Sequence, residues 1–396
     1  MLAQDIPRPS LTKKIAQTIR RNPVTALIGP RQCGKTFLAR AIAAAEPHSY
    51  FDLEMPSDAD RLAQPMTALE PLRGLVIVDE VQRRPELFPI LRVLSDRRDL
   101  PTRFLLLGSA SPDLSRQSSE SLAGRVAFIN MSGFSLTETG PDAMRSLWWR
   151  GGFPRSFLSE SDEASREWRQ NFILTFLERD IRQFGVEVPA LVLRRLWNML
   201  AHYHGQIWNA SEISRSLGES HTTVKRHLDI LTGALMVRQL PAWFENLGKR
   251  QVKAPKVYLR DTGLMHELMG IESFARLEGH PKLGASWEGF VIEEVLRTTG
   301  DREAYFWATH SGNELDLLVF INGKPIGIEI KYSDTVSLTK SMHIALDDLK
   351  LESLLVVHPG SKSYPLGPKA WAISIFDLET RLKQICGCSP DPECKG

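Results

Sequence analysis

Cysteine is scarce in this sequence: only four of its 396 residues are cysteines, and three of them, Cys386, Cys388 and Cys394, lie close to the C-terminus. The fourth, Cys33, lies inside a glycine-containing loop pattern, where it cannot form a structural cross-link. So few cysteines indicate a reducing compartment and a fold without disulfides. The last three have no fourth cysteine and no histidine beside them, which favours a flexible tail over residues 386–396 rather than a metal site.

Long apolar runs are also missing, and none approaches the length of a membrane-spanning helix. The first ten residues, MLAQDIPRPS, lack the apolar segment of a signal peptide. We therefore expect a cytoplasmic protein without a membrane partner. The net charge of only +2 means that any affinity for nucleic acid must come from local patches. The length predicts two or three domains.

What the sequence does contain is a phosphate-binding loop at residues 29–36, GPRQCGKT, which matches G-x-x-x-x-G-K-[ST] at every fixed position. A buried strand is predicted before it, over 24–28, and an alanine-rich helix after it, over 37–45. Backbone amides of such a loop surround phosphates at a helix N-terminus. Lys35 should reach the β- and γ-phosphates, and Thr36 should ligate Mg²⁺. The predicted nucleotide-binding residues are Gly29, Gly34, Lys35, Thr36 and Asp79.

Two further apolar strands end in polar residues. The segment LVIVDE at 75–80 has the form of a Walker B strand, with Asp79 near Mg²⁺ and Glu80 placed to polarise the attacking water. The next strand, over 103–108, leads to Ser109, which is our candidate for a residue that senses the γ-phosphate. An ordinary turn or helix cap is the alternative for Ser109.

Together these segments resemble the AAA-type P-loop ATPases of prokaryotes that carry a C-terminal domain long described only as a domain of unknown function. The resemblance covers nearly the whole chain. It rests on GPRQCGKT, LVIVDE, GSASPDLSRQSSESLAGRV, WRGGFP, LERDI, GASWEGFVIEEVL, and ELDLLV followed by GIEIKYS. It implies ATP and Mg²⁺ as cofactors and a homo-oligomeric ring, with a hexamer as the expected form.

In such proteins an arginine that follows the sensor strand often completes the site of a neighbouring subunit. Arg125 is the best positional match and Arg116 the second choice. An arginine finger stabilises charge on the transferred phosphate, but an ordinary surface arginine is the alternative for each. Arg155 is a candidate for a second sensor.

The middle of the chain is predicted to be helical. Amphipathic helices over 165–184 and 188–203 would form the lid that usually follows an AAA-type core. A capped short helix over 211–218, a glycine turn and a second helix over 221–231 match a helix-turn-helix.

Strands over 234–240 and 256–259, with the basic segment 249–253 between them, extend this motif to a winged helix. Polar residues at the start of a recognition helix meet bases and phosphates. The predicted DNA-binding residues are Thr222, Thr223, Lys225, Arg226, Lys249, Arg250 and Lys253. The alternative is a winged helix that only packs against the ATPase.

The C-terminal part combines a helix over 286–297 with strands that carry acids among apolar residues. The strands are predicted over 305–308, 314–320, 325–331, 353–357 and 370–376, with a turn at Asn322-Gly323 and a helix over 340–350. Asp316 and Glu329 are costly on such strands unless a cation pairs with them.

This pattern resembles the PD-(D/E)XK nuclease core and, within it, the archaeal Holliday-junction resolvases. Asp316 and Glu329 match the two carboxylates that hold Mg²⁺ or Mn²⁺, and Lys331 matches the lysine that orients or activates water. For the helix acid we choose Glu288, because it shares the face of Val291 and the other apolar residues. A degenerate nuclease fold kept for binding is the alternative.

We therefore predict an α/β protein made of five segments. They are a P-loop AAA-type ATPase core built on a parallel sheet (1–155), a helical lid (156–204), a winged helix-turn-helix (205–270), a restriction-endonuclease-like mixed α/β domain (271–385) and a tail (386–396). The predicted function is MgATP hydrolysis coupled to binding and metal-dependent cleavage of DNA, with branched or four-way junction DNA as a candidate substrate. The alternatives are a non-nucleolytic DNA-binding regulatory ATPase and a protein-remodelling AAA module.

Overall fold

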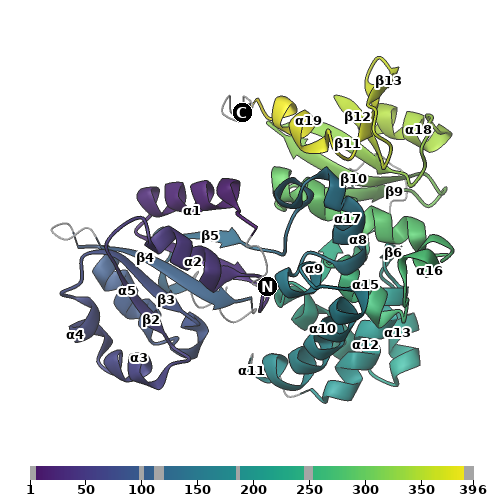
Figure 1. The fold of residues 1–396 in the computed structure, drawn as a ribbon. Helices are drawn as coiled ribbons and strands as arrows, with labels where there is room; N and C mark the ends of the chain where they lie inside the picture. Colours follow the sequence, from purple (N-terminus) through teal and green to yellow (C-terminus); the bar gives the residue numbers. More distant parts are fainter. Residues whose placement is uncertain (1–5, 98–101, 111–119, 184–187, 245–252, 388–396) are drawn as a thin grey trace.

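The computed structural model describes residues 6–97, 102–110, 120–183, 188–244 and 253–387. In these residues the chain forms three β-sheets, each with helices packed against it (Figure 1). The described helices include none that is long and apolar enough to cross a membrane.

The N-terminal sheet is parallel throughout, with the strand order β2-β3-β4-β1-β5. Its strands are β1 (Val24–Gly29), β2 (His48–Asp52), β3 (Gly74–Asp79), β4 (Thr102–Ser109) and β5 (Val126–Asn130). Its helices are α1 (Pro9–Arg21), α2 (Lys35–Ala43), α3 (Pro56–Arg61), α4 (Pro65–Leu69) and α5 (Leu87–Ser95), with a 3₁₀ turn at Val81–Arg83. Apolar residues on both faces bury β1, β3 and β4, as is typical of a parallel sheet covered by helices. This confirms the predicted parallel sheet.

Short helices lead from β5 into the helical middle of the chain. They are α7 (Leu136–Thr139), a 3₁₀ turn (Pro141–Ala143), α8 (Met144–Arg150) and α9 (Pro154–Phe157). The longer helices that follow are α10 (Asp162–Thr175), a π-helical turn (Phe176–Asp180), α11 (Ile181–Gln183) and α12 (Ala190–His202). The ring of Phe153, just before α9, packs against Phe172 of α10. Phe176 of the π-helical turn packs against Trp197 of α12.

A small antiparallel sheet with the order β6-β8-β7 follows. Its elements are β6 (Gln206–Ile207), α13 (Ala210–Leu217), α14 (His221–Gly233), β7 (Val237–Leu240) and β8 (Lys256–Leu259). Gly218 ends α13 in the left-handed conformation (φ +72°), as a C-terminal glycine commonly does. Two helices and a three-stranded sheet are therefore present, while the winged-helix assignment stays a prediction.

The C-terminal sheet is mixed, with the order β13-β14-β12-β11-β10-β9. Its strands are β9 (Ala304–Ala308), β10 (Glu314–Ile321), β11 (Lys324–Ile330), β12 (Ser353–His358), β13 (Tyr364–Gly367) and β14 (Ala370–Ser374). The remaining helices are α15 (Thr262–Leu268), α16 (Phe274–Glu278), α17 (Leu283–Thr299), α18 (Lys340–Asp348) and α19 (Leu378–Ile385). Helix α17 covers one face of this sheet and α18 the other.

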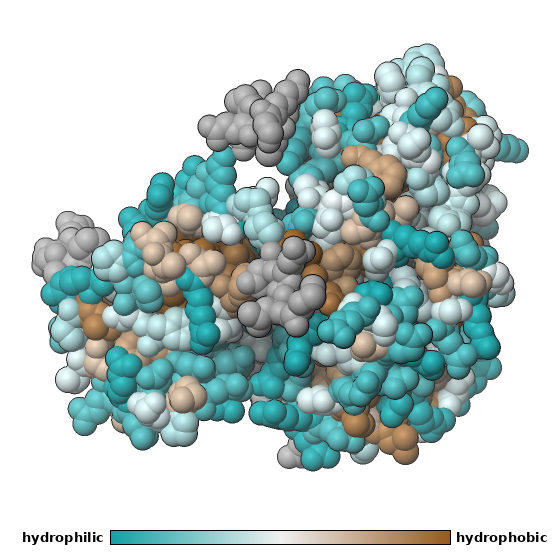
Figure 2. All heavy atoms as spheres, viewed as in Figure 1, coloured by the Kyte–Doolittle hydropathy of each residue, from teal (hydrophilic) through white to brown (hydrophobic). Residues whose placement is uncertain are grey.

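Strands β5, β6 and β13 have no counterpart among the predicted strands, whereas the strands that were predicted agree with the structure to within a few residues. β5 is an edge strand of five residues, and its Phe128 is 42% exposed. A half-exposed edge strand needs neither a continuous apolar run nor strict alternation, so its sequence carries a weak signal. Figure 2 shows that hydrophobic residues gather near the middle of the drawn face, while its outer rim is mostly hydrophilic.

A group of glycines allows the backbones of distant segments to touch. A Cβ atom on Gly133 would lie 2.3 Å from the carbonyl carbon of Gly152. One on Gly151 would lie 2.2 Å from Oδ1 of Asp261, whose Oδ2 accepts a hydrogen bond from the Gly152 amide (2.8 Å). These contacts explain the Gly-Gly pair of the WRGGFP segment, since no larger residue fits there.

We predict that Gly151→Ala destabilises the protein by about 1–3 kcal/mol more than Gly140→Ala, because only the first adds an atom against a packed carboxylate. The two glycines are matched, since both have a positive φ (+79° and +84°) and nothing lies within 4 Å of a Cβ built on Gly140. Thermal or urea unfolding of the two variants measures the difference. Equal losses would contradict the packing argument.

Candidate functional site

The phosphate loop begins where β1 ends and closes onto the first turn of α2. Gly34 has φ +97° and Gln32 has φ +62°, so the loop takes two left-handed positions before the helix starts. A Cβ atom on Gly29 would lie 2.5 Å from the carbonyl oxygen of Met131, just after β5. Both glycines of the pattern are therefore required by the backbone, and the loop presents its amides at the N-terminus of α2.

The polar side chains predicted at this loop come together. The buried Lys35 donates to the carbonyl oxygens of Gly29 (3.0 Å) and Pro30 (2.8 Å). The Thr36 hydroxyl donates to Oδ2 of Asp79 (2.8 Å). A hydroxyl and a carboxylate in contact beside a phosphate loop are a donor set that suits Mg²⁺. These residues therefore fit the predicted MgATP site.

Tyr50 on β2 also donates to Oδ2 of Asp79 (2.7 Å). Burial and the neighbouring Asp79 raise the pKa of the Tyr50 phenol, so the phenol keeps its proton and stays a donor. The carboxylate of Asp79 is therefore fixed from two sides, by Thr36 and by Tyr50.

Glu80 and Ser109 are joined by Gln82, a residue that no sequence motif indicates. Nε2 of Gln82 donates to Oε2 of Glu80, and Oε1 of Gln82 accepts from the Ser109 amide (3.3 Å). Burial raises the pKa of Glu80 above its ordinary value, against the lowering effect of Lys35 and Arg31. The Ser109 hydroxyl is buried and has no hydrogen-bond partner among the described residues. Glu80 also has φ +56°, and such backbone strain is common at functional sites.

A cavity of about 460 Å³ opens in front of the loop. It is lined by Arg31, Gln32, Gly34, Lys35, Thr36, Glu54, Glu80, Pro154, Arg155, Thr175, Arg179 and Asp180. Its wall therefore comes from the parallel sheet on one side and from α9, α10 and the π-helical turn on the other. Arg155, predicted as a second sensor, lies in this wall and is exposed.

An ion pair joins the two sides of the cavity. Nη1 of Arg31, in the phosphate loop, contacts Oδ1 of Asp180 at 2.7 Å. Asp180 belongs to the LERDI segment and is almost fully buried, and this burial raises the pKa of its carboxyl group. The loop that would hold phosphates is thus tied directly to the helical part of the chain.

The arginine-finger candidates lie elsewhere. Arg125 directly precedes β5, at the edge of the sheet opposite the phosphate loop, and its guanidinium pairs with Asp96 (2.6 Å). It does not line the cavity of its own chain. Arg116 lies outside the described residues. The arginine-finger assignment stays a prediction that concerns a second copy of the chain.

The DNA-binding candidates of α14 lie at its N-terminal end. Thr222, Lys225 and Arg226 are exposed there and Thr223 is partly exposed, next to the capping Ser220. Lys253 is exposed just before β8, whereas Lys249 and Arg250 lie outside the described residues.

The C-terminal candidates meet at the end of the β10–β11 pair. The amide of Ile330 donates to Oδ2 of Asp316 (2.8 Å), which places Asp316 beside the strand that carries Glu329. Nζ of Lys331 contacts Oε1 of Glu329 at 2.6 Å. Oε2 of Glu329 is buried and has no partner among the described residues. Glu288, from α17, faces the same cluster.

A lysine that belongs to none of the sequence motifs, Lys256, lies within this acid cluster. Its Nζ is 3.3 Å from Oε1 of Glu288 and 4.0 Å from Oδ1 of Asp316, and it also pairs with Glu314. Tyr258 donates to Oε1 of Glu288 (2.5 Å). In the part of the chain that the structure describes, no group of three or more His, Cys, Asp or Glu side chains is placed to hold a metal ion.

The carboxylates of this cluster are strongly perturbed. Burial raises the pKa of Glu288 to about 7, with a further upward contribution from Asp316 and a downward one from Lys256. Burial and Asp316 also raise the pKa of Glu329 to about 7. The oxygens are the ligands that Mg²⁺ or Mn²⁺ prefers, but in this arrangement a protein cation lies among them, so the residues do not fit a bound metal.

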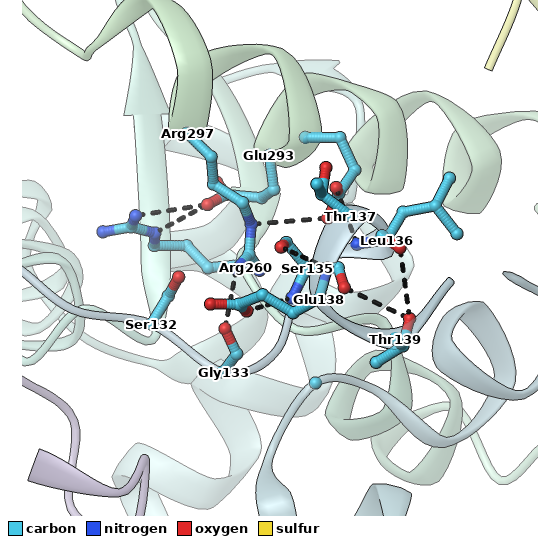
Figure 3. Close-up of polar contacts among 12 residues, drawn as sticks. Ser132, Gly133, Ser135, Leu136, Thr137, Glu138, Thr139, Arg260, Glu293 and Arg297 are labelled. Atoms are coloured by element: carbon cyan, nitrogen blue, oxygen red, sulfur yellow. Dashed lines mark hydrogen bonds and ion pairs between the residues drawn. The ribbon is translucent and has the colours of Figure 1, made fainter. Parts of the chain in front are cut away.

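The other acids of α17 serve a different contact (Figure 3). Glu293 is buried between Arg238 (2.5 Å) and Arg260 (3.1 Å). Burial alone would raise the pKa of Glu293, but the two arginines lower it to about 2. Glu294 accepts from the Leu136 amide (3.0 Å). Both glutamates therefore have their partners away from the acid cluster.

Sequence signals for the unpredicted residues are weak. Gln82 lies two positions after the Walker B glutamate, and that proximity is its only signal. Tyr50 lies in the middle of an ordinary five-residue strand. Lys256 opens a short apolar strand, where a lysine is unusual, but nothing in the sequence connects it with α17 or β10.

Three family models match the chain in sequence order. A model described as an AAA domain matches residues 21–140. Models described as domains of unknown function, DUF8612 and DUF4143, match residues 141–275 and 283–378. The first match agrees with the predicted P-loop ATPase fold and supports ATP hydrolysis at the loop described above.

Curated relatives match nearly the whole chain. An uncharacterised protein of Mycobacterium tuberculosis strain H37Rv is 50% identical over 375 residues, which is 95% of this chain and 85% of that protein. An uncharacterised protein of Mycobacterium bovis strain AF2122/97 gives the same values.

Solved structures resemble the chain less well. A Walker-type ATPase of Pyrococcus abyssi is 16% identical, with a TM-score of 0.47, and the match covers 67% of this chain and 96% of that one. The RuvB Holliday junction branch migration motor of Thermotoga maritima is 18% identical, with a TM-score of 0.30, covering 60% and 90%. At these TM-scores the two structures carry no argument about this chain.

We predict that Gln82→Ala lowers the kcat of ATP hydrolysis by about 10- to 100-fold, because Glu80 loses the amide that orients it, while nucleotide affinity stays within about 3-fold. Steady-state kinetics together with nucleotide titration separate the two effects. Gln17→Ala, an exposed glutamine on α1, is the control. A loss that lies wholly in nucleotide affinity would contradict the positioning role.

Proposed function

This chain belongs to the family of the two mycobacterial proteins that match it over most of its length, and we propose that it is an ATP hydrolase that acts on DNA. Hydrolysis takes place at the phosphate loop. In the C-terminal domain, Glu288, Asp316 and Glu329 would hold a divalent metal ion for DNA cleavage only after Lys256 has left them. The observation that carries the DNA part is the meeting of Asp316, Glu329 and Lys331 at one end of β10 and β11. Branched or four-way junction DNA is the candidate substrate, by analogy with the resolvases.

At the phosphate loop each residue has a distinct task. Lys35 and the loop amides bind the phosphates, and Thr36 and Asp79 are placed to hold Mg²⁺, which neutralises charge on the transferred phosphoryl group when bound. Glu80 accepts a proton from the attacking water or orients it, and Gln82 holds Glu80 in place. The buried Ser109 hydroxyl, without a partner among the described residues, is available to the γ-phosphate or the water.

DNA contact is assigned to the start of α14. Its exposed side chains are polar or basic, and a helix N-terminus adds a favourable partial charge toward phosphate. Such contacts position the protein on DNA without specifying sequence. The assignment rests on this exposed basic face together with the small sheet behind it.

A ring of identical chains is part of the proposal. The ATP cavity contains arginines of its own chain, Arg31, Arg155 and Arg179, while Arg125 lies partly exposed at the opposite edge of the sheet. An arginine at that edge acts on phosphate only if a neighbouring copy places it there. A hexamer is the form that the family resemblance implies.

One observation favours a second candidate function. In the C-terminal cluster, the Lys256 ammonium already lies beside the carboxylates that would hold the catalytic metal. A DNA-binding regulatory ATPase with an inert nuclease-like domain accounts for this without any rearrangement. The two candidates make different predictions for cleavage.

We expect Lys225→Ala/Arg226→Ala to weaken binding to duplex DNA for all sequences, and to reduce the slope of log affinity against log salt by about 1 for each phosphate that the variant no longer neutralises. Fluorescence anisotropy at several salt concentrations measures both quantities. Arg73→Ala/Arg97→Ala removes the same charge at the far edge of the ATPase sheet and should leave them unchanged. Equal effects of the two pairs would contradict the assignment of α14.

Cleavage is tested with linear and four-way DNA, in Mg²⁺ or Mn²⁺, using the wild type, Lys331→Ala and Lys35→Ala. We expect Lys331→Ala to lose cleavage by at least ~100-fold and to keep ATP hydrolysis, because its ammonium acts only at the C-terminal cluster. Lys35→Ala should lose ATP hydrolysis.

Cleavage that persists in Lys331→Ala would exclude the nuclease assignment. An intact wild type that never cleaves, but whose ATP hydrolysis responds to DNA, would support the regulatory candidate. ATP hydrolysis that is indifferent to every DNA would favour a protein-remodelling module instead.

A further inference from the structure

Lys256 is one of the least exposed charged residues in the described chain, with 3% of its surface accessible. It is the first residue of β8, in the small middle sheet, yet its ammonium lies among side chains of the C-terminal domain. It contacts Glu288 of α17 at 3.3 Å, Asp316 of β10 at 4.0 Å and Glu314 of β10. The ammonium also lies 5.5 Å from the centre of the Phe306 ring.

A buried ammonium is costly unless carboxylates surround it, and here the surroundings suit a cation. Burial by itself would lower the pKa of Lys256, but Glu288, Asp316 and Glu314 outweigh burial and raise it. Lys256 therefore keeps its charge at neutral pH. The carboxylates gain a counter-ion without taking one from solution.

The position of this ammonium matters because its carboxylate partners include two of the three predicted metal ligands. A divalent ion bound by Glu288 and Asp316 would need oxygens within about 2.0–2.6 Å. Two cations cannot share these oxygens, since at such separations they repel each other strongly. Lys256 and a metal ion are thus alternatives at one place.

We propose that Lys256 is an internal cation that closes the C-terminal acid cluster to metal ions as long as β8 stays docked on α17 and β10. The proposal deepens the proposed function, because it concerns the regulation of the nuclease-like site. Opening the site requires β8 to move relative to α17. Strand β8 pairs with β7, and β7 follows α14 in the chain. A displacement of α14 when a ligand binds at its start would therefore be passed through β7 to the strand that carries Lys256.

A second side chain of β8, Tyr258, also holds Glu288 in place. Tyr258, two residues on and therefore on the same face of the strand, donates to the same glutamate oxygen (2.5 Å). Glu288 is thus held by two side chains of β8 at once. Both contacts occupy Oε1 of Glu288 and keep that oxygen from a metal ion.

The test measures Mn²⁺ binding to the full chain without nucleotide, by electron paramagnetic resonance of the free ion. The variants are wild type, Asp316→Asn, Lys256→Met, Lys256→Met/Asp316→Asn and Lys324→Met. We expect Lys256→Met to bind one Mn²⁺ per chain at least ~10-fold more tightly than the wild type. The added Asp316→Asn should remove that binding.

Lys324→Met is the matched control, because it removes a lysine of the same domain that pairs with the exposed Glu352 (3.1 Å) and not with the acid cluster. It should bind Mn²⁺ no better than the wild type. ATP hydrolysis by each variant reports whether it is folded. If Lys256→Met does not fold, Lys256→Gln takes its place, and the wild-type measurement stands in either case.

Two results would overturn the proposal. One is Mn²⁺ binding by the wild type that Asp316→Asn abolishes, since the site would then be open while Lys256 is present. The other is a folded Lys256→Met or Lys256→Gln that binds Mn²⁺ no better than the wild type. This test measures metal binding and not cleavage, so its result does not depend on whether the domain is a nuclease. The cleavage assay on linear and four-way DNA decides that question separately.

Discussion

The contact between the backbones of Gly133 and Gly152 is the constraint on which the arrangement of the chain depends. The Phe134 amide donates to the Gly152 carbonyl (2.6 Å), and Nη1 of Arg297 donates to the Gly133 carbonyl (2.7 Å). The segment that follows β5 is therefore hydrogen-bonded, at two neighbouring residues, to Gly152 and to Arg297 of α17. On one side the chain continues to Arg155 in the wall of the ATP cavity, and on the other α17 leads to the acid cluster. Neither partner can shift without changing the other.

Helix α17 turns this contact into a link between the two sites. Its C-terminal half carries Glu294 and Arg297, which bind the segment after β5, while Glu288 lies near its other end in the acid cluster. A helix of this length moves as a rigid body, because each residue is held by its hydrogen bonds along the axis. Through α17, the segment that leads to the wall of the ATP cavity and the acid cluster therefore contact one and the same helix.

Sequence alone was sufficient where the chemistry is contiguous, and it failed where the chemistry joins distant segments. Residues 29–36 and Asp79 were predicted because loop, helix and strand end are encoded within short stretches of fixed spacing. Glu288 was predicted because helical periodicity assigns a face to each side chain. Gln82 connects Glu80, just after β3, with Ser109, at the end of β4. Nothing in the position of Gln82 in the sequence shows that these two strand ends are adjacent. Lys256 meets acids that lie more than thirty residues away, on elements whose mutual docking only tertiary structure determines.

The presence of Lys256 changes how an intact acid–acid–lysine set is interpreted. Asp316, Glu329 and Lys331 satisfy the sequence pattern of a nuclease. Such a pattern identifies the ligand residues, but it does not show whether a cation from another segment already lies among them. An internal ammonium competes for the carboxylates at an effective concentration that does not depend on the solution, so Lys256 can exclude metal even where each carboxylate retains its affinity. The nuclease and the regulatory ATPase therefore need not differ in their acids at all. They differ in whether β8 ever leaves α17, and that is decided by the strength of a docking contact rather than by the chemistry of the site.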